Sequence, residues 1–153
     1  MNDIGVIHAT NGGIILVDAE DFPVLTKHNW QLFEGRAIRG ARPQSIRMHR
    51  FLMSAPKGVE VDHKNRLPWI NCKWNLRFAT RSQQLANRSK AQKTSSKFKG
   101  VCWDKRNKKW MASIKISQRN HHLGRYESER DAAIAYNGAA MFHFGEFALL
   151  NEV

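Results

Sequence analysis

Residues 61–88 read VDHKNRLPWINCKWNLRFATRSQQLANR, and this stretch decides the fold of the region around it. It opens with an adjacent acid and histidine, Asp62 and His63, and carries Asn75 near its middle. Short apolar runs on either side of a proline-containing loop are typical of strands, and Thr80 is a favourable N-cap for a helix. The stretch therefore predicts a strand, a loop, a second strand and a helix. The expected bounds of these elements are residues 59–63, 76–79 and 81–90.

Positive charge is concentrated in and just after this stretch. Residues 63–103 carry ten Lys or Arg, and no acidic residue lies between Asp62 and Asp104. The flanks are nearly balanced, with seven basic and seven acidic side chains in residues 1–62 and eight against six in residues 104–153. The net charge of +12 therefore comes mainly from one region. Such a concentration indicates a surface for a polyanion, with nucleic acid favoured over an anionic membrane.

Length and composition are those of a globular protein. At 153 residues and 42% hydrophobic content, the chain fits one domain or two small ones with a core. Cys72 and Cys102 form no C-x-x-C pair, which argues against a zinc ribbon or a disulfide framework. No apolar run approaches about 18 residues, and the N-terminus lacks the pattern of a secretory signal. We therefore expect a cytoplasmic protein without a membrane partner, and no obligate protein partner is evident.

The region before residue 59 predicts short strands and isolated helical turns. An apolar run is followed by an acidic turn, and two short runs split by Gly40 and Pro43 indicate a hairpin. Apolar spacing of three or four residues favours one or two helical turns in two further segments. In chain order we expect a strand at 13–17, helical turns at 22–30, hairpin strands at 35–39 and 45–48, and helical turns at 47–54.

A change of pattern near residue 90 predicts a domain boundary. Residues 89–97 are small, polar and basic, without apolar periodicity. Beyond them, three strand-like runs and an alanine-rich amphipathic segment predict a small three-stranded antiparallel sheet packed on one helix. Ser128 and Asp131 resemble a capping box, and Gly145 a C-cap. We expect strands at 98–103, 110–116 and 121–126, a helix at 131–144, and a division into an N-terminal domain (1–90), a basic linker (91–97) and a C-terminal domain (98–153).

The acid and histidine of the first stretch suit metal-assisted hydrolysis of a phosphodiester. His63 can take a proton from water near neutral pH, and Asp62 can hold a hard divalent cation such as Mg²⁺. An amide oxygen of Gln84 or Asn87, three residues apart on one helix, is a suitable second ligand. Asn75 can accept a hydrogen bond from the His63 ring and fix its tautomer. Neighbours in a regular strand point to opposite faces, so a shared site requires the strand to end or bend here.

These residues and their spacing resemble the HNH endonuclease family, most of all the homing endonucleases encoded by phages and introns. The matching positions are Val61-Asp62-His63-x-Asn65, Asn71, Asn75-Leu76-Arg77-x-x-Thr80, Gln83 and Asn87-Arg88, preceded by Leu16-Val17-Asp18-x-Glu20-Asp21-Phe22, Trp30 and Met48-His49-Arg50. The resemblance implies an α+β fold with a ββα-metal finger. It also implies site-specific cleavage of double-stranded DNA, with one Mg²⁺ or Mn²⁺ ion per active site.

The same resemblance implies a role for each matching residue. His63 is expected to be the general base, Asp62 a metal ligand and Asn75 the residue that steadies the site. Gln84 stands where the family usually has Asn or His as the second metal ligand, and Asn87 stays an alternative ligand. The DNA contacts expected in this stretch are Arg77, Arg81 and Arg88.

The C-terminal region resembles the plant ethylene-response-factor (APETALA-two) domain. The matching positions are Lys97-Phe98-Lys99-Gly100-Val101, Trp110-x-Ala112-x-Ile114, Leu123-Gly124-x-Tyr126, Ala132-Ala133-x-Ala135-Tyr136, Ala139-Ala140 and Gly145-x-x-Ala148-x-x-Asn151. The resemblance implies a sheet laid in the DNA major groove and backed by one helix. The contact residues expected by position are Lys99, Cys102, Asp104, Lys105, Ser113, Lys115, Asn120 and His122. Plant arginines are replaced at Cys102, Asp104 and Asn120, so no target sequence is carried over.

Two other functions stay open. The first is a DNA-binding regulator with a weakened or inactive nuclease site, because Gln84 replaces the usual ligand. The second is an RNA-binding protein, which is the weaker hypothesis. His49 favours core packing or a phosphate contact over catalysis, and Trp103 and Trp110 favour sheet packing over base stacking. If the chain is phage-encoded, as the resemblance implies, it acts in the cytoplasm of a bacterial host. The target sequence, and whether one or both strands are cut, are left open.

Overall fold

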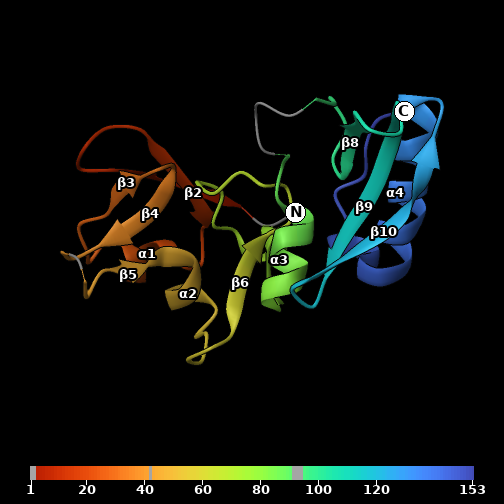
Figure 1. The fold of residues 1–153 in the computed structure, drawn as a ribbon. Helices are drawn as coiled ribbons and strands as arrows, with labels where there is room; N and C mark the ends of the chain where they lie inside the picture. Colours follow the sequence, from red (N-terminus) through yellow and green to blue (C-terminus); the bar gives the residue numbers. More distant parts are fainter. Residues whose placement is uncertain (1–2, 42, 91–94) are drawn as a thin grey trace. The chain divides into compact units, whose positions relative to one another are not determined.

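The computed structural model describes residues 3–41, 43–90 and 95–153 (Figure 1). Contacts within the chain divide it into two compact units, Met1–Thr80 and Arg81–Val153. Both units combine short helices with small antiparallel sheets, so the α+β class is confirmed. Within the described ranges, no helix is long and apolar enough to cross a membrane.

The N-terminal unit begins with a two-stranded sheet. Strand β1 (Ile4–His8) pairs antiparallel with β2 (Ile14–Asp18), which confirms the strand expected at residues 13–17. Gly5 leaves room for a neighbouring ring, since a Cβ atom there would lie 2.8 Å from Cδ2 of Phe22. Strand β1 was not separately expected, because this glycine interrupts its apolar run.

A short helix leads into a three-stranded sheet. Helix α1 (Phe22–Leu25) is followed by β3 (Gln31–Phe33), β4 (Arg36–Arg39) and β5 (Ile46–Arg47), in the spatial order β3-β4-β5. The expected hairpin is confirmed as β4 and β5, which pair antiparallel. Strand β3 was not predicted, because three residues are too few to show an alternation of apolar and polar side chains.

Trp30 lies at the centre of the N-terminal core. Its side chain is 1% exposed, and its Nε1–H donates to the Leu25 carbonyl oxygen at 2.9 Å. Ile15 and Val17 of β2 are fully buried against it, as is the first residue of helix α2 (Met48–Leu52). The core therefore joins the first sheet to the helical turn that carries His49.

A second hairpin carries the motif residues. Strands β6 (Glu60–His63) and β7 (Leu76–Ala79) pair antiparallel, with Asp62 opposite Arg77, and both strands were expected. The intervening loop ends in a 3-10 turn, η1 (Lys73–Asn75). Backbone pairing ties this loop to β2, because the Asn71 N–H donates to the Leu16 carbonyl at 2.7 Å and Leu16 bridges Ile70.

The C-terminal unit has a three-stranded antiparallel sheet in the order β10-β9-β8. Its elements are β8 (Val101–Asp104), β9 (Lys109–Ile116), β10 (Arg119–Tyr126), α4 (Glu129–Phe144) and η2 (Gly145–Phe147). Figure 1 shows α4 along one face of this sheet, where Ala112, Ala132 and Ala133 are fully buried and allow close approach. The Ser128 hydroxyl accepts from the backbone N–H groups of Arg130 and Asp131, which confirms the N-cap.

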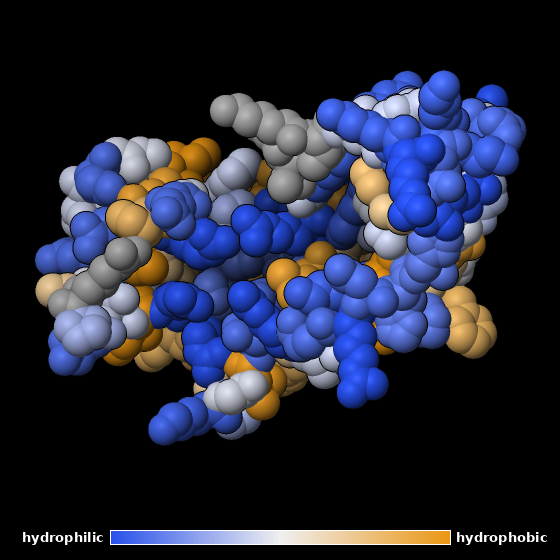
Figure 2. Space-filling model, viewed as in Figure 1, coloured by the Kyte–Doolittle hydropathy of each residue, from blue (hydrophilic) through white to orange (hydrophobic). Residues whose placement is uncertain are grey.

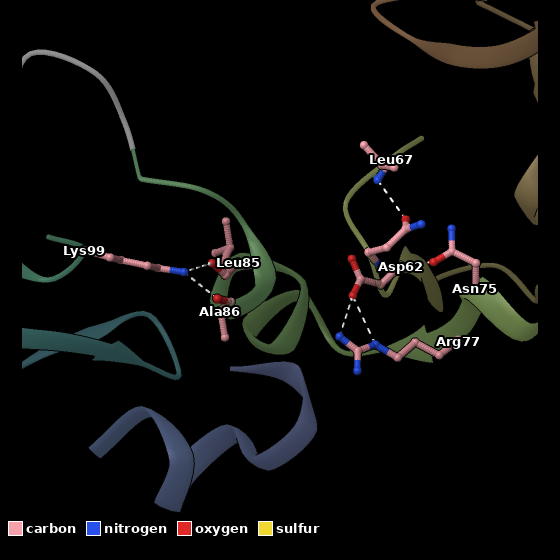
Figure 3. A network of polar contacts seen from close by, with 8 residues as sticks. Asp62, Leu67, Asn75, Arg77, Leu85, Ala86 and Lys99 are labelled. Atoms are coloured by element: carbon pink, nitrogen blue, oxygen red, sulfur yellow. Dashed lines mark hydrogen bonds and ion pairs between the residues drawn. The ribbon is translucent and has the colours of Figure 1, made fainter. Parts of the chain in front are cut away.

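Helix α3 (Arg81–Asn87) belongs to the C-terminal unit. The Lys99 ammonium donates to the carbonyl oxygens of Leu85 (3.3 Å) and Ala86, as Figure 3 shows. It also donates to the Arg88 carbonyl at 2.7 Å, so it caps the end of the helix. The helix was expected to reach residue 90 and ends three residues earlier. The expected domain division stays a prediction, because residues 91–94 of its linker lie outside the described residues.

Candidate active site and nucleic-acid-binding surface

Asp62 forms a nearly buried ion pair at the end of β6. Its Oδ2 atom accepts from Nε of Arg77 at 3.2 Å and from Nη2 at 3.0 Å, across the strand pair (Figure 3). The Asp62 and Arg77 side chains are 9% and 10% exposed. Arg77 was expected to contact DNA, whereas the structure engages its guanidinium with Asp62. The sequence missed this pairing, although cross-strand register carries the signal for it.

His63 is held by a neighbouring amide. Its Nε2 atom lies 3.4 Å from Oδ1 of Asn71, which is fully buried and donates its Nδ2–H to the Pro68 carbonyl at 3.4 Å. An amide oxygen can only accept, so this contact is a hydrogen bond in the tautomer that has the proton on Nε2 and the lone pair of the neutral ring on Nδ1. Burial lowers the pKa of His63, while the Asn71 hydrogen bond and the Asp62 charge partly oppose that shift. A neutral imidazole at neutral pH is the form that a general base requires.

His49 packs edge-on against His63. The two ring centroids are 5.1 Å apart with an interplanar angle of 76°. His49 is 6% exposed, in agreement with core packing, and burial is the main cause that lowers its pKa to about 3. Its Nδ1 atom has no hydrogen-bond partner among the described residues. Sequence reasoning missed this contact, because residues 49 and 63 belong to different elements.

Asn75 braces the loop and not the histidine ring. Its Oδ1 accepts from the Asn65 N–H at 3.0 Å, and its Nδ2–H donates to the Ile70 carbonyl at 2.9 Å. The hydrogen bond to His63 that we expected from Asn75 is made by Asn71. Asn75 is fully buried, so it steadies the loop that follows the acid–histidine pair.

Strand β6 ends at His63, as a shared site requires. The Arg66 N–H donates to the His63 carbonyl at 3.0 Å, which closes a tight turn. Arg66 has a φ of 64°, in the left-handed region that non-glycine residues seldom adopt. The backbone therefore changes direction directly after the motif. Asp62 and His63 are 7% and 8% exposed at this strand end.

The oxygen donors available suit a hard cation. Asp62 offers a carboxylate, and Gln84 of α3 an amide oxygen that accepts from Nη1 of Arg81 at 2.8 Å. Asn87, the alternative ligand, is 5% exposed. The described residues contain no group of three or more His, Cys, Asp and Glu that could hold a metal by themselves. Carboxylate and amide oxygens are hard ligands, so each of these side chains by itself suits Mg²⁺, which keeps several of its waters, better than a soft metal.

Four of the expected DNA contacts, all on β9 and β10, lie on one face of the C-terminal sheet. Strand register pairs Lys115 with Asn120 and Ser113 with His122, so these side chains project from the face opposite α4. We call this surface the outer face; hydrophilic residues predominate over β9 and β10 in the view of Figure 2. Arg125, which pairs with Met111, also lies on it and was not expected.

The remaining predicted contacts divide into exposed and engaged side chains. Arg81, Arg88 and Lys105 are exposed, as a phosphate contact requires. Lys99 was also expected to contact DNA, whereas its ammonium caps α3. Trp103 and Trp110 pack edge-to-face with ring centroids 5.0 Å apart, which fits the expected sheet packing.

An acid–histidine pair at the end of a two-stranded hairpin, beside a buried histidine and amide, defines a candidate hydrolytic centre. The chain is 30% identical over 148 residues to an uncharacterized HNH endonuclease of Acanthamoeba polyphaga mimivirus, a match that covers 93% of this chain and 76% of the relative. No family model matches, and no solved structure gives a significant match. On this relationship, the chain belongs to the HNH endonuclease family.

Proposed function

We propose that the protein is a site-specific, metal-dependent endonuclease that hydrolyses phosphodiester bonds of double-stranded DNA. The observation that carries the proposal is the pair of Asp62 and His63 at the end of β6, with His63 Nε2 beside the amide oxygen of Asn71. In our proposal this contact selects the Nε2–H tautomer of His63. Membership of the HNH family supports the nuclease activity. The local excess of ten basic side chains over residues 63–103 supports a phosphate backbone as the substrate.

His63 acts as the general base in this mechanism. Nδ1 carries the lone pair, so it takes the proton from the attacking water as that water approaches phosphorus. Asn71 keeps the ring in this tautomer, and the His49 ring limits its rotation. Asp62 would hold the divalent ion, and Gln84 or Asn87 would be its second protein ligand. When bound, the cation supplies positive charge beside the phosphate and the leaving oxygen.

The C-terminal unit binds the duplex in our proposal. Its outer face carries Ser113, Lys115, Asn120 and His122 at adjoining positions; the last three are exposed and Ser113 is partly exposed. The exposed Arg81 and Arg88 supply backbone contacts. If about six phosphates are neutralised, log K for DNA falls against log salt with a slope of roughly −5. A slope near zero in a salt titration would contradict the backbone contacts.

Plasmid cleavage tests the catalytic proposal. Supercoiled plasmid, or DNA from the region flanking the gene, is incubated with the protein and Mg²⁺ or Mn²⁺, and relaxed and linear forms are measured. We expect wild type to cut and His63→Ala not to cut, because the base is removed. His8→Ala is the matched control, since His8 is exposed on β1. Equal cutting by wild type and His63→Ala would reject His63 as the base.

Asn71 gives a second test of the same centre. Asn71→Leu removes the acceptor for His63 Nε2, so we expect kcat to fall by roughly tenfold or more while KM for DNA changes little. Histidine ¹⁵N NMR should show loss of the single Nε2–H tautomer in this variant. An unchanged tautomer with unchanged kcat would remove Asn71 from the mechanism.

A DNA-binding regulator remains the second candidate function. It is favoured by Gln84, which replaces the usual ligand, and by the Arg77 guanidinium on the Asp62 carboxylate. Gln84→Asn separates the two functions. A rise in metal-dependent cutting marks a weakened nuclease, whereas continued inactivity with unchanged DNA binding favours the regulator.

A further inference from the structure

The outer face contains an arginine–carboxylate pair that spans all three strands. Arg125 extends from β10 across β9, and its Nε–H donates to Oδ2 of Asp104 on β8 at 2.8 Å. Arg125 pairs with Met111 of β9, and Asp104 pairs with Lys109 of the same strand. Met111 and Lys109 are two residues apart and therefore lie on the same face of β9. The pair therefore lies among the side chains that the proposed function assigns to the duplex.

The Asp104 carboxylate is anchored by its own turn. Oδ1 accepts from the backbone N–H groups of Arg106 and Asn107, both at 3.1 Å, and Oδ2 also accepts from Nδ2 of Asn107 at 2.7 Å. The hydrogen bond from Arg125, together with these donors, lowers the pKa of Asp104 well below its usual range. Asp104 is thus a fixed anion, and it sets both the position and the plane of the guanidinium that it binds.

The guanidinium keeps its outer edge for another partner. Only Nε is used by Asp104, and within the described residues the two Nη atoms of Arg125 make no hydrogen bond. The Arg125 side chain is 43% exposed. Two parallel N–H donors at the end of an oriented arginine match the O6 and N7 acceptors of guanine in the major groove.

We propose that Arg125 is a specificity-determining residue that reads a guanine through its Nη atoms, and that Asp104 is the residue that positions it. The inference rests on the proposed binding of duplex DNA by the outer face. A base edge is favoured over a phosphate because the carboxylate cancels most of the pair's net charge. The ion pair therefore adds little attraction to the phosphate backbone of DNA. It does restrict the arginine to one orientation, which recognition of a base edge needs.

Selection from a randomised duplex library tests the proposal. The full chain carrying His63→Ala is used without metal, so that binding is measured without cutting, and the bound sequences are compared with those of further variants. We expect Arg125→Gln to lose the preference for guanine at one position and to bind the selected site roughly 5- to 150-fold more weakly. Arg125→Lys should not restore it, because a single ammonium cannot make the paired contact. Asp104→Asn should weaken the preference at that same position.

Controls separate this inference from the proposed function. Arg130→Gln removes one charge from α4, on the other side of the sheet, and should leave the selected sequence unchanged; circular dichroism checks that each variant is folded. Uniformly weaker binding by Arg125→Gln on all sequences, with a salt slope reduced by about one, would make Arg125 a phosphate contact and overturn the inference. An unchanged selected sequence would also overturn it. Failure of the parent protein to bind duplex DNA would instead overturn the proposed function of the outer face.

Discussion

Replacing Arg77 by methionine tests the role of the ion pair at the candidate catalytic centre. Both members of the pair are about nine-tenths buried, with 9% and 10% of their side chains exposed. The Arg77→Met change takes two hydrogen bonds and a positive charge from the buried Asp62 carboxylate, and breaking a buried pair in this way typically costs about 3–5 kcal/mol. The Asp62 carboxylate retains some access to water, so we expect the lower end, a loss of about 3 kcal/mol. For a chain of this length, that corresponds to a fall in Tm of about 6–12 °C.

The measurement is urea denaturation followed by tryptophan fluorescence, without divalent metal. Arg36→Met is the matched control, because Arg36 pairs with Glu34 at 3.5 Å with side chains 52% and 70% exposed. An exposed pair of this kind contributes little, so the control should lie within about 0.5 kcal/mol of wild type. Equal stabilities of Arg77→Met and Arg36→Met would refute the argument that burial makes the first pair strong.

Metal gives the same variant a second result. If Asp62 is a ligand, Mg²⁺ replaces the lost positive charge and stabilises Arg77→Met by about 2.7 kcal/mol when its concentration is about 100 times Kd. The double variant Arg77→Met, Asp62→Asn should gain nothing from Mg²⁺. Equal gains in the two proteins would show that the cation binds elsewhere.

Three further perturbations test other parts of the structure. In wild type, the free energy of unfolding should fall as pH drops below 6.5, by up to about 4–5 kcal/mol near pH 3, because His49 takes up a proton readily when unfolded but only at a pKa of about 3 when folded. In His49→Phe, the midpoint of urea denaturation should therefore depend less on pH than in wild type. An equal dependence in the two proteins would contradict this. Lys99→Met removes the donor to three carbonyls, so amide exchange in α3 should become faster at a cost of about 1.5–3 kcal/mol, and unchanged protection would argue against the cap. Ser128→Ala removes the N-cap of α4 and should lower the free energy of unfolding by about 1 kcal/mol in thermal melts, with Ser117→Ala, on an exposed turn, as the neutral comparison.

Elements with a strong local pattern could be predicted from the sequence. Strands β6 and β7 and helix α4 appear near the expected bounds, because alternation, capping residues and alanine spacing act within a few residues of one another. Strands β1 and β3 were not separately expected. One contains a glycine and the other has three residues, so their pairing partners stabilise them more than their own propensity does.

The candidate site was predictable in composition but not in its contacts. Local spacing identified Asp62, His63 and Asn75, whereas the partner of His63 proved to be Asn71 and not Asn75. The His49 contact and the Arg77 ion pair depend on how separate segments fold against each other, which no local pattern encodes. Lys99 was likewise predicted to contact DNA, although its ammonium lies against the end of a helix.

That lysine has a practical consequence for dissecting the protein. A recombinant fragment begun at residue 98, where the strand pattern starts, would keep Lys99 but discard the carbonyl oxygens that it binds. The fragment would also lose the Ala86 oxygen that accepts from the Leu149 N–H at 3.2 Å, so the segment around Leu149 would lose this backbone hydrogen bond. A fragment begun at residue 80 keeps both connections. Any exchange of this module between nucleases should therefore carry the short helix with it.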